Sequence, residues 1–392
     1  MKQITILGST GTIGVNTLDV VQRNPESYQV FALTANKNIE RLVEQAAQFS
    51  PQFVVIVDAS LQSELQLQLD AKNCQSSVLV GAASLVEVAE ASQVDMVMAG
   101  IVGAAGLLPT LAAAKSGKRV LLANKESLVM SGQLLIDAVE SGGGELLPID
   151  SEHNAIFQCL PDNNQSLVKN GVKRILLTAS GGPFRTRDLS TFGHISPEEA
   201  VAHPNWVMGQ KISVDSATMM NKGLEVIEAH WLFGTAEGDV EVLIHPESLI
   251  HSMVEYIDGS VLAQLGNPDM RTPIAHAMSW PKRMVSGDSS LDFLAAKAMT
   301  FETPDLERFP CLTLSYSALA EGGTAPAILN AANEVAVSAF LQKKLRFTQI
   351  PQMIEHCLSS IEINAADELD QILADDQLAR QTATQWLSET VE

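Results

Sequence analysis

Short apolar runs alternate with amphipathic stretches over the first 150 residues of the chain. Seven runs rich in Val, Ile, Leu and Ala predict β-strands near residues 3–7, 28–34, 53–58, 77–80, 95–99, 119–122 and 144–149. Between two of them, the stretch 39–49 repeats apolar residues at helical spacing. Alternation of strands and helices is typical of βαβ units, so this region is predicted to form a mostly parallel sheet covered by helices.

The pattern changes after residue 150. It predicts a strand at 173–178, a Gly/Pro/Ser-rich stretch at 180–204, a helix at 218–233, and strands at 240–245 and 252–265, the last with a hairpin turn at Asp258-Gly259. From 312 onward the pattern is helical, and a long helix carries an apolar stripe of Leu369, Ile372, Leu373, Ala379, Ala383 and Trp386. We therefore predict an α/β protein with domains at 1–150, 151–285 (α+β) and 312–392 (helical), and a linker at 286–311.

The amino-acid composition indicates a folded globular protein and excludes some classes of partner. The chain has 392 residues, 46% of them hydrophobic and 18% charged, as in folded globular proteins, and its net charge is −21. Such an acidic chain repels nucleic acid and anionic membranes, so neither is expected as a partner. Residues 362–392 are the most acidic segment, with eight carboxylates against one base, Arg380. The four cysteines fit neither a zinc site nor a disulfide framework, and no export signal is visible, so a cytoplasmic location is expected.

A glycine-rich turn follows the first predicted strand. Gly8, Gly11 and Gly14 form G-x-x-G-x-x-G, and the hydroxyls of Ser9, Thr10 and Thr12 add donors. Glycines at a helix start let the backbone approach a pyrophosphate, so the turn predicts dinucleotide binding in a Rossmann-like domain; the alternative is a tight turn with no ligand. The second strand ends in Asn36-Lys37-Asn38, with a cation and no acid, which favours NADP over NAD unless Lys37 is merely solvated.

Carboxylates and phosphate-type donors follow in the next segment. Asp150 and Glu152, read as the end of a strand, would lie on one side of it, and Glu225 stands at a predicted helix start. Oxygen ligands select Mg²⁺ or Mn²⁺, although carboxylates at strand ends are commonly just solvated; His153 would be a fourth ligand or a structural residue. Donors suited to a phosphate monoester are Ser180, His203, Ser216, Asn221 and Lys222, each of which alone could be a turn, cap or surface residue.

Together these motifs closely resemble those of the 1-deoxy-D-xylulose 5-phosphate reductoisomerases of the non-mevalonate isoprenoid pathway. The matching segments are GSTGTIG (8–14), IVGAAGL (101–107), ANKESLV (123–129), PIDSEHNAIFQCL (148–160), ASGGPF (179–184), the 31 residues 203–233, HPESLIHSMVEY (245–256) and NPDMRTPI (267–274). Thr12 and Asn36 depart from the residues common in that family, Ser and Gly. Thr12 keeps the hydroxyl, whereas Asn36 changes the segment expected to bind the 2′-phosphate.

The resemblance implies a homodimer that uses NADPH and a divalent cation (Mg²⁺, Mn²⁺ or Co²⁺). Its reaction converts 1-deoxy-D-xylulose 5-phosphate to 2-C-methyl-D-erythrose 4-phosphate by retro-aldol cleavage, aldol re-formation and reduction. The implied metal ligands are Asp150, Glu152 and Glu225, which with Lys125 are the catalytic residues. The implied cofactor contacts are Thr10, Gly11, Thr12, Ile13, Asn36, Lys37, Asn38, Asn124, Glu126 and Met208. The implied substrate contacts are Lys125, Ser151, Glu152, Ser180, His203, Trp206, Ser216, Asn221, Lys222 and Glu225, with Trp206 and Met208 on a mobile flap.

Two alternatives remain at this stage. A metal-free NADP-dependent dehydrogenase of the homoserine or semialdehyde type would share the glycine-rich turn, but it has no use for Asp150 and Glu152 paired with Glu225. A non-catalytic NADPH-binding sensor would bind the cofactor and turn over nothing.

Overall fold

The computed structural model describes residues 1–161, 166–202, 209–236, 238–296 and 298–390. The chain forms two compact units. The first comprises residues 1–127, 135–154 and 269–289, and the second comprises 128–134, 155–268 and 290–392.

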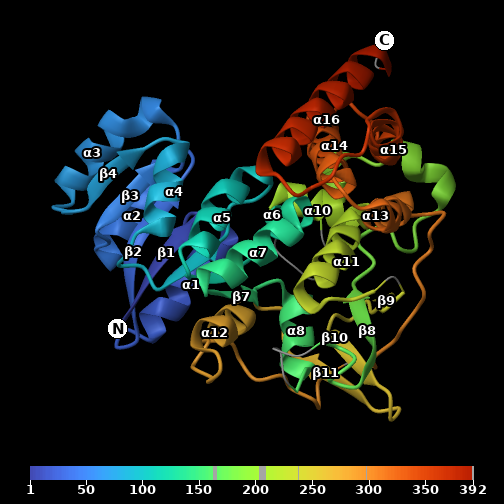
Figure 1. Cartoon of the computed structure of the whole chain (residues 1–392), viewed down its shortest axis with the longest axis horizontal. Coiled ribbons are helices and arrows are strands. Elements are labelled where there is room, and N and C mark those ends of the chain that lie inside the picture. The colour runs from blue at the N-terminus through green and yellow to red at the C-terminus, as the bar shows by residue number, and fades with distance from the viewer. Residues whose placement is uncertain (162–165, 203–208, 237, 297, 391–392) are drawn as a thin grey trace. The chain divides into compact units, whose positions relative to one another are not determined.

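The first unit is built on a parallel sheet of seven strands in the order β4-β3-β2-β1-β5-β6-β7 (Figure 1). The strands are β1 (Lys2–Leu7), β2 (Tyr28–Ala35), β3 (Phe53–Ile56), β4 (Ser77–Val80), β5 (Met96–Ala99), β6 (Arg119–Leu122) and β7 (Glu145–Pro148). Central strands such as β5 are fully buried, which explains why they appear in the sequence as continuous apolar runs. All seven predicted strands and the Rossmann-like arrangement are confirmed.

Helices connect and cover these strands. They are α1 (Thr12–Arg23), α2 (Ile39–Phe49), η1 (Ala59–Leu61), α3 (Gln62–Ala71), α4 (Ala82–Glu90), η2 (Ala104–Gly106) and α5 (Leu107–Lys115). The residues of α6 (Lys125–Ser131), α7 (Gln133–Gly142) and α8 (Ser151–Cys159) are divided between the two units. Helix α2 has the bounds that its apolar spacing predicts. The apolar stretch 96–114 folds as β5, η2 and α5, as its glycines and proline indicate.

Helix α12 (Arg271–Ser279) also belongs to the first unit, although the sequence analysis assigned these residues to the central domain. Two side chains of the sheet hold its end: Tyr28 Oη donates to the carbonyl of Met278 at 3.1 Å, and Arg119 Nη1 donates to the same carbonyl at 3.2 Å and to that of Trp280 at 3.0 Å. Contacts this distant in sequence leave no signal in local periodicity. The rest of the predicted domain division stays a prediction.

The second unit contains a mixed sheet in the order β11-β10-β8-β9. Strand β8 (Val172–Ala179) pairs in parallel with β9 (Val240–Ile244) and antiparallel with β10 (Ile250–Tyr256), which pairs antiparallel with β11 (Val261–Leu265). The predicted hairpin at Asp258-Gly259 is confirmed: Gly259 has a φ of 87°, and Asp258 Oδ1 accepts from the backbone N–H of Ser260 at 2.9 Å.

Helices make up the rest of the second unit. They are η3 (Leu189–His194), α9 (Pro197–Ala200), α10 (Gln210–Ala217), α11 (Met220–Phe233), α13 (Pro310–Glu321), α14 (Ala325–Leu341), η4 (Phe347–Gln349), α15 (Ile350–Ser360) and α16 (Leu369–Thr390). Gly223 of α11 lets α13 approach closely, because a Cβ there would lie 2.0 Å from Ser315 Oγ. Beyond residue 312 the described chain is helical, as predicted.

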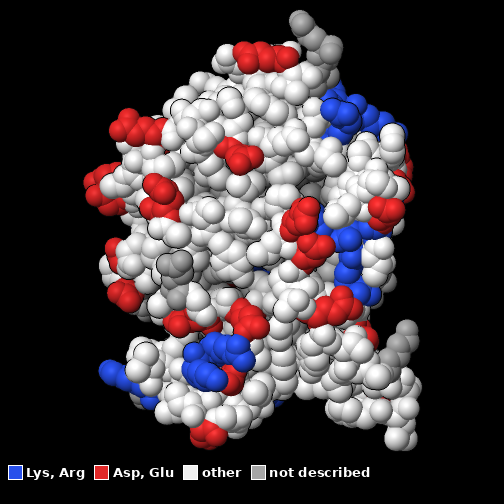
Figure 2. Space-filling view, turned by 90° about the vertical axis from the view of Figure 1, so that its right-hand side faces the viewer, with Lys and Arg blue, Asp and Glu red and all other residues white. Residues whose placement is uncertain are grey.

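The acidic C-terminal segment is less exposed than its charge suggests. Asp376 of α16 is 8% exposed and accepts from Arg380 at 2.8 and 2.9 Å, and Arg380 also donates to Glu334 of α14 at 2.8 Å. Elsewhere, carboxylates are widely spread over the face in Figure 2, while basic side chains gather in a few places. Among the described residues, no helix combines the length and the apolar character needed to span a membrane.

The core of the second unit generates a stability prediction. Phe340 of α14 is 1% exposed and lies edge-on to Phe347 with ring centroids 5.8 Å apart, so Phe340→Ala removes a large buried side chain. We expect a loss of about 3–5 kcal/mol in the free energy of unfolding, measured by chemical denaturation. The control Leu378→Ala, at a residue 45% exposed on α16, should cost less than about 1 kcal/mol. Equal losses in the two variants would contradict this description of the core.

Candidate functional site

The glycine-rich turn lies at the carboxyl edge of the first unit's sheet, between β1 and α1. β1 is the strand at which the sheet order reverses, the usual place for a dinucleotide in such folds. Gly14 lets α1 lie against the turn, since a Cβ there would be 2.4 Å from the carbonyl oxygen of Ser9. Gly11 is the N-cap of α1 and gives the helix no side-chain cap, so the first turn of the helix remains suited to an anion.

The hydroxyls around this turn do not all face outward. Ser9 is fully buried, and its Oγ donates to Gln45 Oε1 at 2.8 Å or to the carbonyl of Thr34 at 3.1 Å. The prediction that Ser9 offers a donor to the cofactor is therefore wrong, because its hydroxyl fastens the turn to α2 and β2. Thr12 and Gly11 are exposed, and Thr10 and Ile13 are half-buried.

The segment after β2 is exposed and carries two cations. Lys37 Nζ is 3.9 Å from Asp58 Oδ2 with 73% of its side chain exposed, and Asn36 is exposed beside it. Asn38 caps α2 by accepting from the backbone N–H of Arg41 at 3.1 Å. Arg41, which the sequence analysis did not single out, donates from Nη1 to the carbonyl of Thr10 at 3.2 Å. Its place four residues after Lys37, on the first turn of α2, is the signal that could have found it.

Asn124, Lys125 and Glu126 follow β6 at the same edge of the sheet. The Asn124 side chain donates to the carbonyls of Ile101 and Gly103, the latter at 2.9 Å, and accepts from the backbone N–H of Ser127 at 2.7 Å. Since its amide is engaged within the protein, a cofactor contact of Asn124 would involve its main chain. Lys125 and Glu126 are 5% and 6% exposed in the first turn of α6.

Asp150 and Glu152 are close together, but for a different reason from the one predicted. β7 ends at Pro148 and α8 begins at Ser151, so Glu152 lies in the first turn of a helix rather than two residues along a strand. A carboxylate oxygen of Asp150 is within 4.8 Å of one of Glu152, and Ser151 Oγ donates to Glu152 Oε2 at 2.6 Å. The predicted proximity is correct and the strand alternation behind it is wrong.

Lys125 forms an ion pair with Asp150, and both side chains are largely buried. Burial alone would raise the pKa of Asp150, but the charges of Lys125 and His153 outweigh it and hold that pKa well below its usual range. Asp150 is therefore an anion, as a metal ligand must be.

The start of α8 is braced from within the first unit. Asn154 Nδ2 donates to the carbonyl of Pro148 at 2.9 Å and lies 3.2 Å from Nδ1 of His276 on α12. His153 is fully buried, with a ring nitrogen within 4.8 Å of an Asp150 oxygen.

In the second unit, the remaining predicted residues gather where α10 meets α11. Met219, with a φ of 62°, separates the two helices, and Asn221 and Lys222 in the first turn of α11 both donate to the Glu225 carboxylate. Gly182 packs against Ser216, since a Cβ there would lie 2.6 Å from the Ser216 carbonyl oxygen, and its N–H donates to Ser180 Oγ at 3.2 Å. The Ser180 loop, Ser216 and the start of α11 are thus neighbours. His203, Trp206 and Met208 lie outside the described residues.

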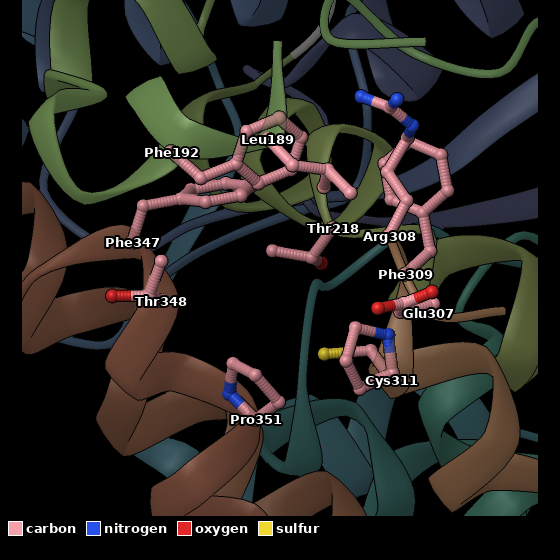
Figure 3. A pocket seen from close by; sticks show the side chains of 11 residues that line it. Leu189, Phe192, Thr218, Glu307, Arg308, Phe309, Cys311, Phe347, Thr348 and Pro351 are labelled. Atoms are coloured by element: carbon pink, nitrogen blue, oxygen red, sulfur yellow. The ribbon is translucent and has the colours of Figure 1, made fainter. Parts of the chain in front are cut away.

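A separate pocket of about 200 Å³ lies in the second unit (Figure 3). Its walls are mainly apolar, with Phe192, Phe309 and Phe347 prominent among them. None of the predicted site residues lines it. The pocket is therefore distinct from the residues that the sequence singles out.

Models of one enzyme family match most of the chain. Residues 4–132 match the family described as 1-deoxy-D-xylulose 5-phosphate reductoisomerase, and residues 146–233 and 265–382 match two C-terminal domain families of the same enzyme. The curated 1-deoxy-D-xylulose 5-phosphate reductoisomerase of Nitrosomonas europaea is 59% identical over 99% of this chain and 94% of its own length, and that of Cellvibrio japonicus is 57% identical over 99% and 98%.

The chain belongs to the 1-deoxy-D-xylulose 5-phosphate reductoisomerase family. A crystal structure of DOX-P reductoisomerase in complex with NADPH, fosmidomycin and magnesium is 44% identical, with a TM-score of 0.96 over 99% of this chain and 98% of that one. The Zymomonas mobilis enzyme in complex with NADPH is 50% identical, with a TM-score of 0.90 over 98% of both chains. The resemblance drawn from the sequence motifs is confirmed, and the metal-free dehydrogenase alternative is not favoured.

His276 generates a prediction about pH. Burial, and to a lesser degree the charge of Arg283, lowers the pKa of His276 to about 4, against 6.5 for an ordinary histidine. Between these values the unfolded chain binds a proton that the folded protein does not, so stability is present above about pH 6.5 and is lost as the pH falls toward 4. We expect His276 to account for a loss of about 2–3 kcal/mol between pH 7 and pH 4.5.

The measurement compares urea unfolding of the wild type with that of His276→Gln across this pH range. The glutamine cannot titrate, so the stability difference between the two proteins should shrink at low pH. Parallel pH profiles would show that His276 is not a buried neutral group.

Proposed function

We propose that this chain catalyses the NADPH- and divalent-cation-dependent conversion of 1-deoxy-D-xylulose 5-phosphate to 2-C-methyl-D-erythrose 4-phosphate, a step of isoprenoid synthesis. Family membership over nearly the whole chain supports the reaction. The single structural observation that carries it is the Asp150–Glu152 carboxylate pair beside the buried Lys125. A metal-free dehydrogenase would have no use for such a pair.

The divalent cation is held by Asp150, Glu152 and Glu225. The first two bring carboxylates within 4.8 Å of each other, a repulsive arrangement that a cation between them relieves. Glu225 is 1% exposed, and hydrogen bonds from Asn221 and Lys222 orient its carboxylate. The carboxylate is therefore held in place to coordinate a cation. An all-oxygen set favours Mg²⁺ or Mn²⁺.

NADPH binds at the carboxyl edge of the first unit's sheet. The pyrophosphate fits the start of α1, where Gly11 provides no side-chain cap and Gly14 allows close approach. The 2′-phosphate is bound by the exposed segment after β2 through Lys37, and Arg41 is close enough to the turn to assist. The complete set of proposed cofactor contacts is Thr10, Gly11, Thr12, Ile13, Asn36, Lys37, Asn38, Asn124, Glu126 and Met208.

The phosphate of the substrate binds at the α10–α11 junction. Ser180, Ser216 and Asn221 supply neutral donors, and Lys222 supplies the cation. An ammonium has three donors, so Lys222 can contact Glu225 and a phosphate at once. His203 and the flap residue Trp206 complete the proposed substrate contacts with Lys125, Ser151, Glu152 and Glu225.

These residues divide the chemistry among them. The bound cation would supply Lewis-acid stabilisation of oxygen charge on the substrate, and NADPH would supply the hydride. Lys125 holds a proton at Nζ beside Asp150 and can donate it in a hydrogen bond to a substrate oxygen. Ser151 Oγ donates to Glu152, and the lone pairs of the same oxygen can accept from a substrate hydroxyl. The phosphate contacts fix the far end of the substrate and so orient its reacting carbons.

The deciding experiment follows NADPH oxidation with 1-deoxy-D-xylulose 5-phosphate, with and without a chelator. Turnover that stops with the chelator and returns with added Mg²⁺ or Mn²⁺ is expected. Turnover of a semialdehyde that the chelator leaves unchanged would favour the dehydrogenase alternative, and cofactor binding without any turnover would favour a sensor.

The chain also acts as a homodimer in the cytoplasm under this proposal. Val261 and Leu262, 47% and 50% exposed on the edge strand β11, and Leu294, 99% exposed, offer apolar surface for a second copy. Sedimentation equilibrium should give twice the mass of 42.1 kDa.

The four free cysteines suit a reducing compartment, which supports the proposed cytoplasmic location.

Asp150→Asn tests the metal ligand assignment. Loss of a charged ligand should lower kcat by roughly 100-fold or more, because charge stabilisation in the transition state is reduced. Asp70→Asn, the same exchange at an exposed residue of α3, should leave kcat unchanged. Steady-state assays over a range of Mg²⁺ concentrations measure both, and near-normal turnover of the Asp150 variant at low metal would exclude Asp150 as a ligand.

Lys37→Ala tests recognition of the 2′-phosphate. A charge-assisted contact is worth about 1.5–3 kcal/mol, so the ratio of kcat/KM for NADPH over NADH should fall roughly 10- to 150-fold. Lys72→Ala removes an exposed lysine of the same unit and should leave the ratio unchanged. If Lys37→Ala also leaves it unchanged while Arg41→Ala lowers it, recognition belongs to Arg41.

A further inference from the structure

A buried carboxylate precedes Ser216, and the proposed function does not use it. Asp215 of α10 is 1% exposed and forms an ion pair with Lys211 one turn earlier, Nζ to Oδ2 at 2.8 Å. Its other oxygen, Oδ1, accepts from Asn333 Nδ2 at 2.8 Å. Asn333 lies in the middle of α14, 118 residues away in sequence, so this hydrogen bond ties α10 to the C-terminal helices.

The hydrogen bond between Asn333 and Asp215 lies directly before the segment that carries the proposed phosphate contacts. The carbonyl of Asp215 accepts from Thr218 Oγ1 at 3.2 Å, and Thr218 Oγ1 accepts from the backbone N–H of Met220 at 3.3 Å. Met219 between them has a φ of 62°. Residues 216–222, here called the junction turn, therefore continue directly from the residue that Asn333 holds.

The polar side chain at position 333 is explained by its contact with Asp215. The side chain is fully buried, and its Oδ1 has no hydrogen-bond partner among the described residues. A leucine of similar size would remove that unsatisfied oxygen, but it would also remove a hydrogen-bond donor from the buried Asp215 carboxylate. The Asn333 amide does one thing that leucine cannot, which is to donate to Asp215.

We infer that Asn333 is a positioning residue for substrate binding: through Asp215 it sets the junction turn so that Ser216, Asn221 and Lys222 meet the phosphate group together. This inference rests on the proposed function, since it assumes a phosphate monoester at that turn. Lys211 neutralises Asp215, which keeps a buried negative charge beside the turn from repelling the incoming dianion.

The chain offers a matched control in the same helix. Asn330 is also fully buried, and its Oδ1 likewise lacks a partner among the described residues. Its Nδ2 donates to Glu334 at 3.1 Å, and Glu334 pairs with Arg380 of α16, so its hydrogen bond leads away from the junction turn. Asn330→Leu and Asn333→Leu therefore make the same chemical change in the same core with different connections.

The test measures, for wild type and both variants, the KM for 1-deoxy-D-xylulose 5-phosphate, the inhibition constant of inorganic phosphate and the Kd for NADPH. In Asn333→Leu the first two should rise about 10-fold while the Kd for NADPH stays within about 2-fold. In Asn330→Leu all three should stay within about 2-fold. A general loss of structure would not affect the phosphate constants alone.

Unchanged phosphate constants in Asn333→Leu, or equal increases in both variants, would overturn the inference. If the leucine variant does not fold, Asn333→Ala, which is too small to clash, takes its place with the same outcomes. Failure of the wild type to turn over the ketose phosphate would instead contradict the proposed function, so the two failures are distinguishable.

Discussion

A carboxylate that is withdrawn from water needs a positive charge beside it, and this chain meets that need with a lysine for each of three carboxylates. Asp150 has Lys125, Glu225 has Lys222 and Asp215 has Lys211. Without its lysine, each carboxylate would be a buried charge with no counter-charge beside it. Removing one partner of a buried ion pair costs about 3–5 kcal/mol.

The proposed binding residues of the two units rest on different kinds of structure. In the first unit, the proposed cofactor contacts and the first two proposed metal ligands lie at the carboxyl edge of a parallel sheet, where successive strands bring residues distant in sequence to one edge. In the second unit, the proposed phosphate contacts lie at a junction between two helices, whose backbone directions are fixed by packing against α13 and α14. Loops can vary without disturbing the sheet, whereas the helix junction is part of the core itself.

The sheet and helices could be predicted because their signal is local. Strands buried on both faces give continuous apolar runs, and α2 gives helical spacing, so the seven strands and α2 were predicted correctly, whereas α12 was not assigned to the first unit. Glu152 shows the limit: it was read as continuing a strand, but β7 ends at Pro148 and α8 begins at Ser151, so Glu152 lies in a helix. Proximity was predicted correctly only because a turn followed by a helix also brings neighbouring side chains together.

Side-chain direction and distant contacts could not be predicted from periodicity. Ser9 lies among glycines that suit a cofactor, yet its hydroxyl donates a hydrogen bond to Gln45 and so connects the turn to α2. Arg41 reaches Thr10 only when α2 is folded beside the turn. Asp376 looks solvated by composition, but it falls on the same face of α16 as Ile372, Ala379 and Ala383, which pack inward.

Helix α12 has a consequence for how the chain is made. The last strand of the first unit's sheet ends at Pro148, but α12, which packs against α1, β6 and β7, begins at Arg271. The ribosome must synthesise β8 to β11 before the apolar residues Ile274, Ala275, Ala277 and Met278 can cover that part of the sheet. Domains normally fold as units during synthesis, starting from the N-terminus. Here the first unit stays open, with apolar surface exposed on the nascent chain, which is the kind of surface that chaperones bind.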